Sequence, residues 1–544
     1  MISREKLTLW GLPLLSAVLM SIPWLVPHAG AVALVAWVPL LIAEDIASRT
    51  GAKRFFFCHY AAFCLWNALT TFWVCNATVG GGLASIFITA AVFSLIFALF
   101  RFAKKRLGGG AVPYILLAAA WIAWERWCLT DAQILWPWLV GGNAFALSTR
   151  LVQWYEYTGV LGGSLWIWAC NLGIFGIISA VSDGSRASRW NAKARAAAAA
   201  GITLVILGPV VASALIYSSC EEVCEGQVEA VIAQPNFDPY HKFESMTQAE
   251  QNAVLLDLFD KGLAERADSS APVLLLAPET FTSDVLLPEM GSSPTVQTFR
   301  AWLRSRPGAE MLYGASAYEI FTTRSAPSKC AREIGGGWLV SRNCAIMEDG
   351  SEGEVYNKSK LVVATELTPY PGLFIPLEKL LCRVFGLRAP LMGRCEGQKQ
   401  ARPLHFRDSI PVGCAVCYES VFGEHCADYV RGGAQAMTVI TNDAWWGDTP
   451  GYRQHFSYSR LRAIELRRDF ARCGNTGISG FIDQRGDVVQ SGPWWESCVM
   501  RGKVNLSSKQ TFFVRHGDVT GRVCTFVFLL LALLLVVRLF VPRS

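Results

Sequence analysis

The sequence predicts a two-part protein: a polytopic α-helical membrane domain of about eight spans, followed by a layered α/β domain. Composition is the first reason, because 52% of the 544 residues are apolar and only 17% are charged, whereas soluble proteins carry about 25% charged residues. Charge distribution is the second. Residues 1–218 hold 15 Lys and Arg against 7 Asp and Glu, and residues 219–544 hold 34 against 36. The basic excess belongs to the apolar half, so the pI of 8.5 does not indicate a nucleic-acid partner. Disordered, collagen-like and small disulfide-rich classes are excluded by the same composition.

Apolar windows long enough to cross a bilayer support the membrane domain. A helix rises about 1.5 Å per residue, so a hydrocarbon core of about 30 Å needs about 20 residues. Buried helices of a large soluble protein are the alternative, but every window would then have to be covered on all faces. The windows are 7–26, 55–74, 83–100, 160–181, 196–217 and 523–541, with weaker ones at 24–43 and 110–124.

The positive charges of the short loops predict the orientation. If the N-terminus is cytoplasmic, 13 of the 15 basic residues in 1–218 lie in cytoplasmic loops, and only Arg126 and Arg150 lie outside. The long region after residue 218 then lies outside the cytoplasm, and the last span returns the C-terminus to the cytoplasm. The first window is too long for a cleaved signal segment, so we expect it to be retained.

The second half reads as alternating strands and helices, which is typical of a layered α/β domain. We expect a membrane domain with seven spans at 1–218, a catalytic domain at 219–510, and a last span with a tail at 511–544. Helix-like stretches lie at 247–264 and 453–468. The strand-like runs are 228–233, 273–277, 311–315, 338–347, 412–417, 437–441 and 477–483.

Segment 367–394 differs from the rest of this half because it mixes prolines with apolar and basic residues. A connection this long is unusual in a compact domain. One physical use is a lid that lies in the lipid headgroup region. A loop packed on its own domain is the alternative.

Three short runs place a carboxylate, an amine and a thiol at or just after predicted strands. Glu279 follows the strand at 273–277, Lys358 lies in 356–362 with Glu366 eight residues later, and Cys417 ends the strand at 412–417. Each run alone is weak evidence for a catalytic site, because a lone Glu or Lys after a strand is more often a surface or capping residue. Together they suit acyl transfer, which needs a nucleophile that first accepts and then releases an acyl group. A cysteine with a pKa near about 8.5 needs a base such as Glu279 and a cation such as Lys358 to stabilise the thiolate and the oxyanion.

The order of these runs resembles the nitrilase (carbon-nitrogen hydrolase) superfamily, as do the later runs 441–447, 462–465 and 475–477. With the membrane half attached, and with the runs 136–138 and 158–162, the chain is similar to the membrane-integrated acyltransferases of that superfamily, which acylate bacterial lipoproteins. The resemblance implies a nitrilase-like αββα sandwich outside the cytoplasm of a multi-pass bacterial inner-membrane protein, with no cofactor and no metal ion. By position, it implies that Glu279 is the general base, Lys358 the oxyanion-stabilising group, Cys417 the nucleophile, Glu366 and Glu419 supporting carboxylates, and Tyr418 and Trp445 residues that shape the pocket.

The resemblance also implies a reaction and its partners. The expected reaction is a ping-pong transfer of an acyl chain from phospholipid, through a Cys417 thioester, to the α-amino group of the diacylglyceryl-cysteine of lipoproteins. A monomer in the bilayer would suffice for it. A membrane-anchored amidase or nitrilase, or a catalytically inactive lipoprotein-binding relative, are the alternative readings.

Cysteine spacing leaves two further possibilities. Cys414 and Cys417 form a C-x-x-C run that could be a redox pair or half a zinc site, with His425 and Cys426 as the candidate second half. Residues three apart on a strand point to opposite faces, which disfavours this. An oxidising compartment permits disulfides; the sequence-near candidates are 220/224, 330/344 and 382/395.

Overall fold

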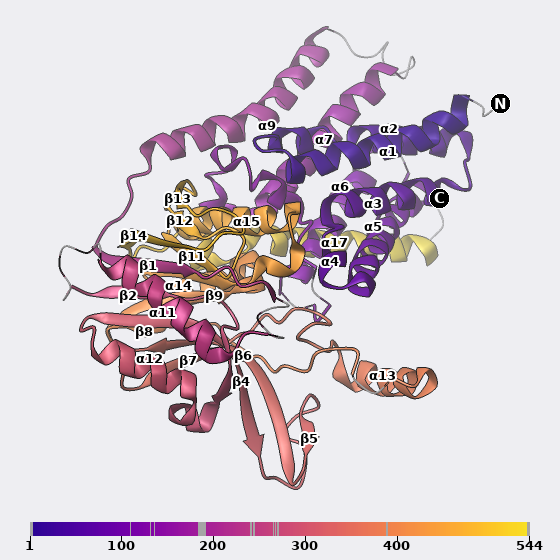
Figure 1. Ribbon diagram of the computed structural model, residues 1–544. Helices are drawn as coiled ribbons and strands as arrows, with labels where there is room; N and C mark the ends of the chain where they lie inside the picture. The colour runs from indigo at the N-terminus through magenta and orange to yellow at the C-terminus, as the bar shows by residue number, and fades with distance from the viewer. Residues whose placement is uncertain are drawn as a thin grey trace.

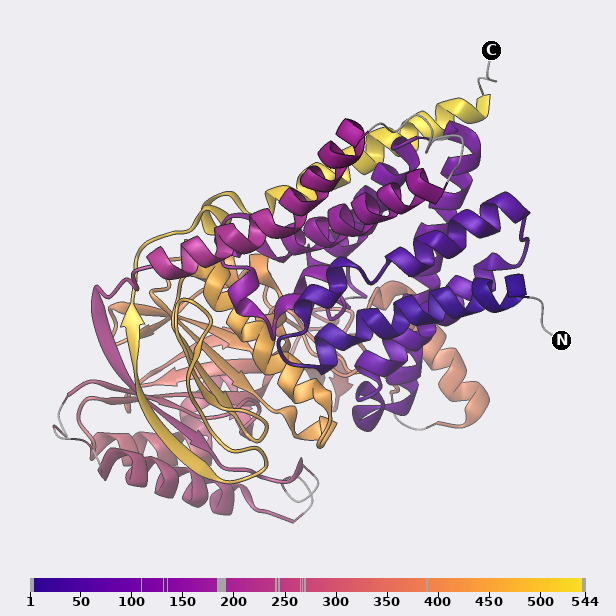
Figure 2. The same cartoon turned by 90° about the horizontal axis from the view of Figure 1, so that it is seen from above.

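The computed structural model divides into a bundle of long helices and a pair of stacked β-sheets (Figures 1 and 2). In both views the two chain ends lie at the end of the bundle that is remote from the sheets. The structure describes residues 4–108, 110–130, 132–134, 136–182, 192–239, 242, 245–264, 266, 268, 271–387 and 390–540.

The bundle contains a helix at each window that the sequence predicts. Among the described residues, six helical segments are long and apolar enough to cross a membrane. The segments at 55–71 and 112–130 are not among these six, the first being only 17 residues long. The helices are α1 (Arg4–Leu25), α2 (Val38–Thr50), α3 (Phe55–Thr71), α4 (Val74–Ala77), α5 (Val79–Leu107), α6 (Val112–Thr130), α7 (Tyr155–Ser182), α9 (Ala192–Ser219) and α17 (Val519–Phe540).

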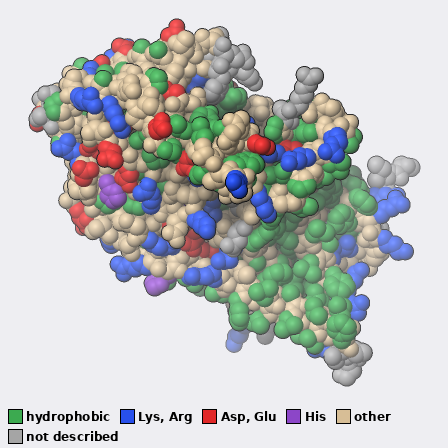
Figure 3. All heavy atoms as spheres, turned by 90° about the horizontal axis from the view of Figure 1, so that it is seen from below, with side chains coloured by type: hydrophobic (Ala, Val, Ile, Leu, Met, Phe, Trp, Pro, Cys, Tyr) green, Lys and Arg blue, Asp and Glu red, His purple; other side chains and the backbone are tan. Residues whose placement is uncertain are grey.

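The surface of the bundle is apolar over a broad area, whereas charged side chains of both signs cover the sheet region (Figure 3). Among the exposed apolar side chains of the bundle, Leu204 in α9 is 71% exposed and Phe526 in α17 is 62% exposed. Such a surface is costly in water and suits lipid contact. This difference separates a lipid-facing part from a water-facing part.

The two sheets form the inner layers of an αββα sandwich, as predicted. Their facing sides share one apolar core that includes Ile232 of β1 and Val439 of β10. Helices α11 (Gln248–Ala264) and α12 (Pro294–Arg304) cover the outer face of the first sheet through a second core. Helices α14 (Gly423–Arg431) and α15 (Pro450–Leu466) lie outside the second sheet, between it and the bundle.

The first sheet has the strand order β14-β1-β2-β4-β6-β5, with β3 beside β4 and β7 beside β6, and the second β13-β12-β11-β10-β9-β8. Strands β1, β2 and β4 run parallel, as do β9, β10 and β11. The strands are β1 (Gly226–Gln234), β2 (Val273–Leu276), β3 (Thr282–Leu286), β4 (Ala309–Phe321), β5 (Arg332–Ile334), β6 (Gly337–Glu348), β7 (Gly353–Asn357), β8 (Leu404–Phe406), β9 (Ile410–Val416), β10 (Ala436–Thr441), β11 (Phe470–Gly474), β12 (Gly480–Ile482), β13 (Val488–Ser491) and β14 (Cys498–Leu506).

Segment 367–394 contains a helix rather than a loop packed on its own domain. Helix α13 (Pro371–Phe385) begins with a proline at its first position and ends at Gly386 in a left-handed conformation, both of which are favourable helix boundaries. It stands apart from the sheets, beside the bundle (Figures 1 and 2). Its outer face is apolar and exposed, and consists of Leu373, Leu377, Leu380, Leu381, Val384 and Phe385.

The sequence-near disulfides are wrong. None of these three pairs forms a disulfide among the residues that the structure describes. Cys344 lies inside β6, where its thiol donates to the carbonyl of Ala315 (3.4 Å). Cys395 interacts electrostatically with Cys330, which belongs to another candidate pair. Pairing therefore cannot be deduced from separation along the chain.

Candidate active site

The carboxyl ends of β2, β7 and β9 place the predicted residues at one edge of the sandwich. Glu279 follows β2, Lys358 is the first residue after β7, and Cys417 is the first residue after β9. Gly314 of β4 permits the close approach of Glu279, because a Cβ there would lie 2.5 Å from the Glu279 Cα. Strands from both sheets therefore contribute to one cluster.

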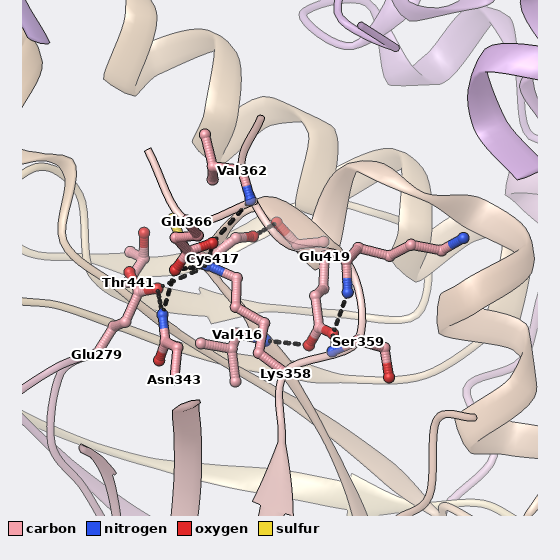
Figure 4. A network of polar contacts seen from close by, with 12 residues as sticks. Glu279, Asn343, Lys358, Ser359, Val362, Glu366, Val416, Cys417, Glu419 and Thr441 are labelled. Atoms are coloured by element: carbon pink, nitrogen blue, oxygen red, sulfur yellow. Dashed lines mark hydrogen bonds and ion pairs between the residues drawn. The ribbon is translucent and has the colours of Figure 1, made fainter. Parts of the chain in front are cut away.

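Lys358 is the centre of this cluster (Figure 4). Its ammonium donates to Glu279 Oε1 at 2.9 Å and to Glu366 Oε1 at 3.0 Å. Its side chain is only 1% exposed. Burial alone would lower the pKa of Lys358, but the Glu279 and Glu366 carboxylates raise it well above its usual value. Lys358 is therefore a fixed positive charge and not a proton donor near neutral pH.

Asn343 of β6 joins the two carboxylates. Its amide nitrogen donates to Glu279 Oε1 at 2.8 Å and to Glu366 Oε1 at 2.6 Å. The main-chain N–H of Val362 donates to the other Glu366 oxygen at 2.7 Å. Both carboxylates thus have defined orientations toward Lys358.

Cys417 lies beside Glu366 and Thr441 at the same edge (Figure 4). Its φ is 52°, a left-handed conformation that is strained for a residue with a side chain. Burial, and next the Glu279 carboxylate, raise the pKa of the Cys417 thiol well above its usual value, against the opposing effect of Lys358. The resting group is therefore a thiol, and its use as a nucleophile requires a base.

Glu419 ties the Cys417 loop to the Lys358 loop. One of its oxygens accepts the main-chain N–H groups of Ser359 (2.6 Å) and Lys360 (3.1 Å), and the other accepts that of Val416 (2.9 Å). The carboxyl is fully buried. Burial would raise the pKa of Glu419, but His425 and these donors lower it below its usual value.

Tyr418 and Trp445, the remaining predicted residues, differ in their exposure. Tyr418 is 7% exposed and belongs to the same apolar core as the bundle helices. Trp445 is 39% exposed. Its neighbour Trp446 packs against Trp73 and Trp138, with ring centroids 4.7 and 5.9 Å away. Trp446 thus contacts the bundle.

Four polar residues at this edge were not predicted: Asn343, Asp443, His455 and Arg472. Single atoms of Cys417, Asp443 and His455 lie within 4.8 Å of one another, a spacing that a metal ion could use. However, Asp443 accepts from Thr441 (2.8 Å) and Arg472 (2.9 Å) and bonds to His455 (2.9 Å). The atoms of Asp443 and His455 that could bind a metal ion are therefore already engaged in hydrogen bonds, and these residues form a hydrogen-bond network. Cys414 is not part of this group, as the strand geometry predicts.

Comparison with known proteins agrees with this architecture. The profile of the carbon-nitrogen hydrolase family matches residues 330–512. The second half of the chain therefore has a nitrilase-superfamily fold. A second profile, that of the apolipoprotein N-acyltransferase N-terminal domain, matches residues 16–173.

Curated relatives extend the match to the whole chain. The apolipoprotein N-acyltransferase of Chlorobaculum tepidum is 30% identical over 547 residues, which cover 97% of this chain and 96% of the relative. That of Geobacter metallireducens is 28% identical and covers 94% and 92%. The chain belongs to the apolipoprotein N-acyltransferase family. It is accordingly an acyltransferase of the nitrilase superfamily and a multi-pass bacterial membrane protein, for which lipids and lipoproteins are the implied substrates.

Two solved structures are similar to about half of this chain. A nitrilase-superfamily protein of Saccharomyces cerevisiae, Nit3, is 14% identical, with a TM-score of 0.37, over 53% of this chain and 93% of its own. An amidase from Nesterenkonia sp. is 13% identical, with a TM-score of 0.34, over 55% and 96%.

Proposed function

We propose that this protein is an apolipoprotein N-acyltransferase that works by a ping-pong mechanism through a thioester on Cys417. One observation carries the proposal: the Lys358 ammonium is held between Glu279 and Glu366 beside a cysteine whose next residue, Tyr418, is packed in the core of the bundle. A nucleophile at that junction can meet an acyl ester of a membrane lipid. A soluble substrate would not require it.

In the first half-reaction the Cys417 sulfur forms a bond to the ester carbonyl carbon of a phospholipid, and its proton passes to Glu279. The Lys358 ammonium stabilises the oxyanion, an effect for which one well-placed donor contributes about 3 kcal/mol. The C–O bond of the ester then breaks, and Glu279 returns the proton to the departing oxygen. Lysophospholipid leaves, and the acyl group remains on sulfur.

In the second half-reaction the α-amino group of a diacylglyceryl-cysteine attacks the thioester. An α-amine has a pKa of about 8, so much of it is neutral at physiological pH. Glu279 takes the proton that the amine loses, and the C–S bond breaks to return Cys417 to the thiol. Glu366, Glu419 and Tyr418 would hold these groups in place, while Trp445 would border the lipid entry.

The exposed apolar face of α13 supports a lipid-facing lid. Val384 and Phe385 are 67% and 70% exposed. The buried Glu378 carboxylate of the same helix accepts from the main-chain N–H groups of Leu391 (2.5 Å) and Met392 (2.8 Å), which fixes the returning chain. A helix that is attached to its own domain and exposes an apolar face suits the bilayer boundary.

We further propose that the protein lies in the bacterial inner membrane as a monomer, with both termini cytoplasmic and the catalytic domain extracytoplasmic. The division into 1–218, 219–510 and 511–544 follows that topology. The basic loops support this orientation. Reporter fusions at the C-terminus and within 219–510 should report opposite sides of the membrane.

The thioester is tested by intact-protein mass spectrometry of the purified protein after incubation with phospholipid vesicles. An acyl adduct should form on the wild type and be absent from Cys417→Ala. An active wild type without an adduct would contradict the mechanism. Addition of a diacylglyceryl-peptide should then convert the adduct to amide; free fatty acid alone would favour a membrane-anchored amidase. Full activity of Cys417→Ala in cells would favour a lipoprotein-binding role.

A further inference from the structure

His455 is a fully buried histidine of α15 that the reaction proposed above does not use. Its ring lies between two tryptophans, with centroid distances of 5.8 Å to Trp138 and 5.4 Å to Trp446. These two rings also border the bundle. His455 thus occupies a fixed position directly behind the Cys417 loop.

The hydrogen bonds of His455 show which ring nitrogen faces the Cys417 carbonyl. Its Nε2 lies 3.1 Å from the carbonyl oxygen of Cys417. A carbonyl oxygen can only accept, so Nε2 carries hydrogen. Its Nδ1 lies 2.9 Å from Asp443 Oδ1, which can only accept, and 2.9 Å from an Arg472 guanidinium nitrogen, which can only donate. Burial, and next Arg472, lower the pKa of His455, whereas Asp443 opposes this effect.

Asp443 and Arg472 fix the other side of the ring. Asp443 bonds to Arg472 at 2.9 Å, and both side chains are fully buried. Burial opposes ionisation of Asp443, but His455 and Arg472 lower its pKa below the usual value, so the carboxylate is charged and paired. The Arg472 charge also limits the repulsion between Asp443 and a Cys417 thiolate. The ring of His455 therefore has one orientation.

The carbonyl of Cys417 belongs to the strained residue of the site. Cys417 has a φ of 52°, and such a backbone persists only when its surroundings hold it. Two groups donate to this carbonyl: Ser420 Oγ at 2.8 Å and His455 Nε2 at 3.1 Å. The Ser420 hydroxyl is also 3.1 Å from His455 Nε2, so the two donors support each other.

We propose that His455 is a positioning residue for the nucleophile: its Nε2–H, together with the Ser420 hydroxyl, holds the carbonyl of Cys417 and so fixes the left-handed backbone that points the thiol toward Glu279 and Lys358. His455 does not move a proton in the reaction, because both of its ring nitrogens are bonded to protein groups. The test of this role by acyl transfer rests on the proposed function, whereas the test by alkylation of Cys417 does not.

The experiment uses the full-length protein in phospholipid vesicles. His455→Gln can place an amide N–H near the position of Nε2, whereas His455→Leu and His455→Asn cannot. We expect His455→Leu to slow both acyl-adduct formation and alkylation of Cys417 by iodoacetamide by about 10- to 100-fold, the effect of losing one buried hydrogen bond. We expect KM for phospholipid to stay near the wild-type value, and His455→Gln to recover most of both rates.

His59 of α3 supplies a matched control, because it is a fully buried histidine whose ring nitrogens have no hydrogen-bond partner among the described residues. His59→Leu should leave both rates unchanged. If His455→Leu does not fold, His455→Asn takes its place in a double-mutant cycle with Ser420→Ala. The double variant should lose more than the product of the two single losses, because the carbonyl then has neither donor.

Three results would overturn the proposal. They are a wild-type alkylation rate in a folded His455→Leu or His455→Asn, equal losses in the Gln and Leu variants, and purely multiplicative losses in the cycle with Ser420→Ala. Equal losses would mean that the imidazole itself takes part in the chemistry. If the wild type forms no acyl adduct, the thioester mechanism fails, and the alkylation rates still decide the role of His455.

Discussion

Replacement of Glu419 by glutamine tests whether a buried carboxylate holds the site together. The change preserves shape but converts one carboxylate oxygen to an NH2 group. One oxygen faces the N–H groups of Ser359 and Lys360, and the other faces that of Val416. In either orientation of the amide, at least one main-chain N–H therefore meets another donor.

The expected cost follows from these contacts. A buried donor without an acceptor costs about 1–3 kcal/mol, and bonds to a neutral oxygen are weaker than bonds to a carboxylate. We therefore expect Glu419→Gln to lower the free energy of unfolding by about 2–4 kcal/mol. Because Ser359 follows Lys358 and Val416 precedes Cys417, the acylation rate should also fall by at least about tenfold.

Denaturant unfolding and acyl-adduct formation measure the two effects, with Glu289→Gln on the exposed surface as the control. The folded pKa of Glu419 is lowered, so its stabilising effect is present at neutral pH and is lost as pH falls through that folded pKa. The stability difference between wild type and variant should accordingly shrink in acid. A variant with wild-type stability and rate would refute this account of Glu419.

Three further predictions concern the charges and the lid. Lys358→Met should reduce acyl-adduct formation by about 10²- to 10³-fold, whereas Lys261→Met on the surface should not; comparable rates in the two variants would contradict the oxyanion role. The pKa of Cys417 is raised by burial and by Glu279 and lowered by Lys358, so iodoacetamide alkylation should rise with pH. At one mildly alkaline pH, Glu279→Gln should speed alkylation and Lys358→Met should slow it; shifts in the same direction would show that these charges do not control the thiol. Phe385→Glu on the exposed face of α13 should slow acylation from vesicles by at least about fivefold with unchanged thermal unfolding, and an unchanged rate would argue against a lipid-facing lid.

Long periodic elements of the fold could be predicted from the sequence, because length and hydropathy suffice for them. Helices α5 and α11 and strands β1 and β10 lie where expected. Short edge strands could not be predicted. Strand β13 is exposed along its whole length and β5 has three residues, so neither has an apolar alternation to detect.

Site residues that directly follow strands could also be predicted from the sequence, because a polar residue just after an apolar run is easy to recognise. Glu279, Lys358 and Cys417 are of this kind. Asn343 and Arg472 lie inside strands, and His455 lies inside a helix. A polar residue within an element normally indicates its solvent-facing side, and only tertiary packing reveals that these three are buried around a charged cluster.

Helix α15 explains how the site keeps a constant place relative to the membrane. Gln454 Oε1 accepts from the indole of Trp138 (2.6 Å) and that of Trp73 (3.3 Å), both in the helical part. Eleven residues later, Glu465 Oε1 accepts the main-chain N–H of Val160, at 2.9 Å. These bonds fix both ends of α15 to the bundle, and His455 on the same helix bonds to the Cys417 loop. The nucleophile is therefore attached rigidly to the bundle on this side. We therefore propose that substrate exchanges on the side of α13, which stands apart from the sheets (Figure 1), and this agrees with a lid that opens toward lipid.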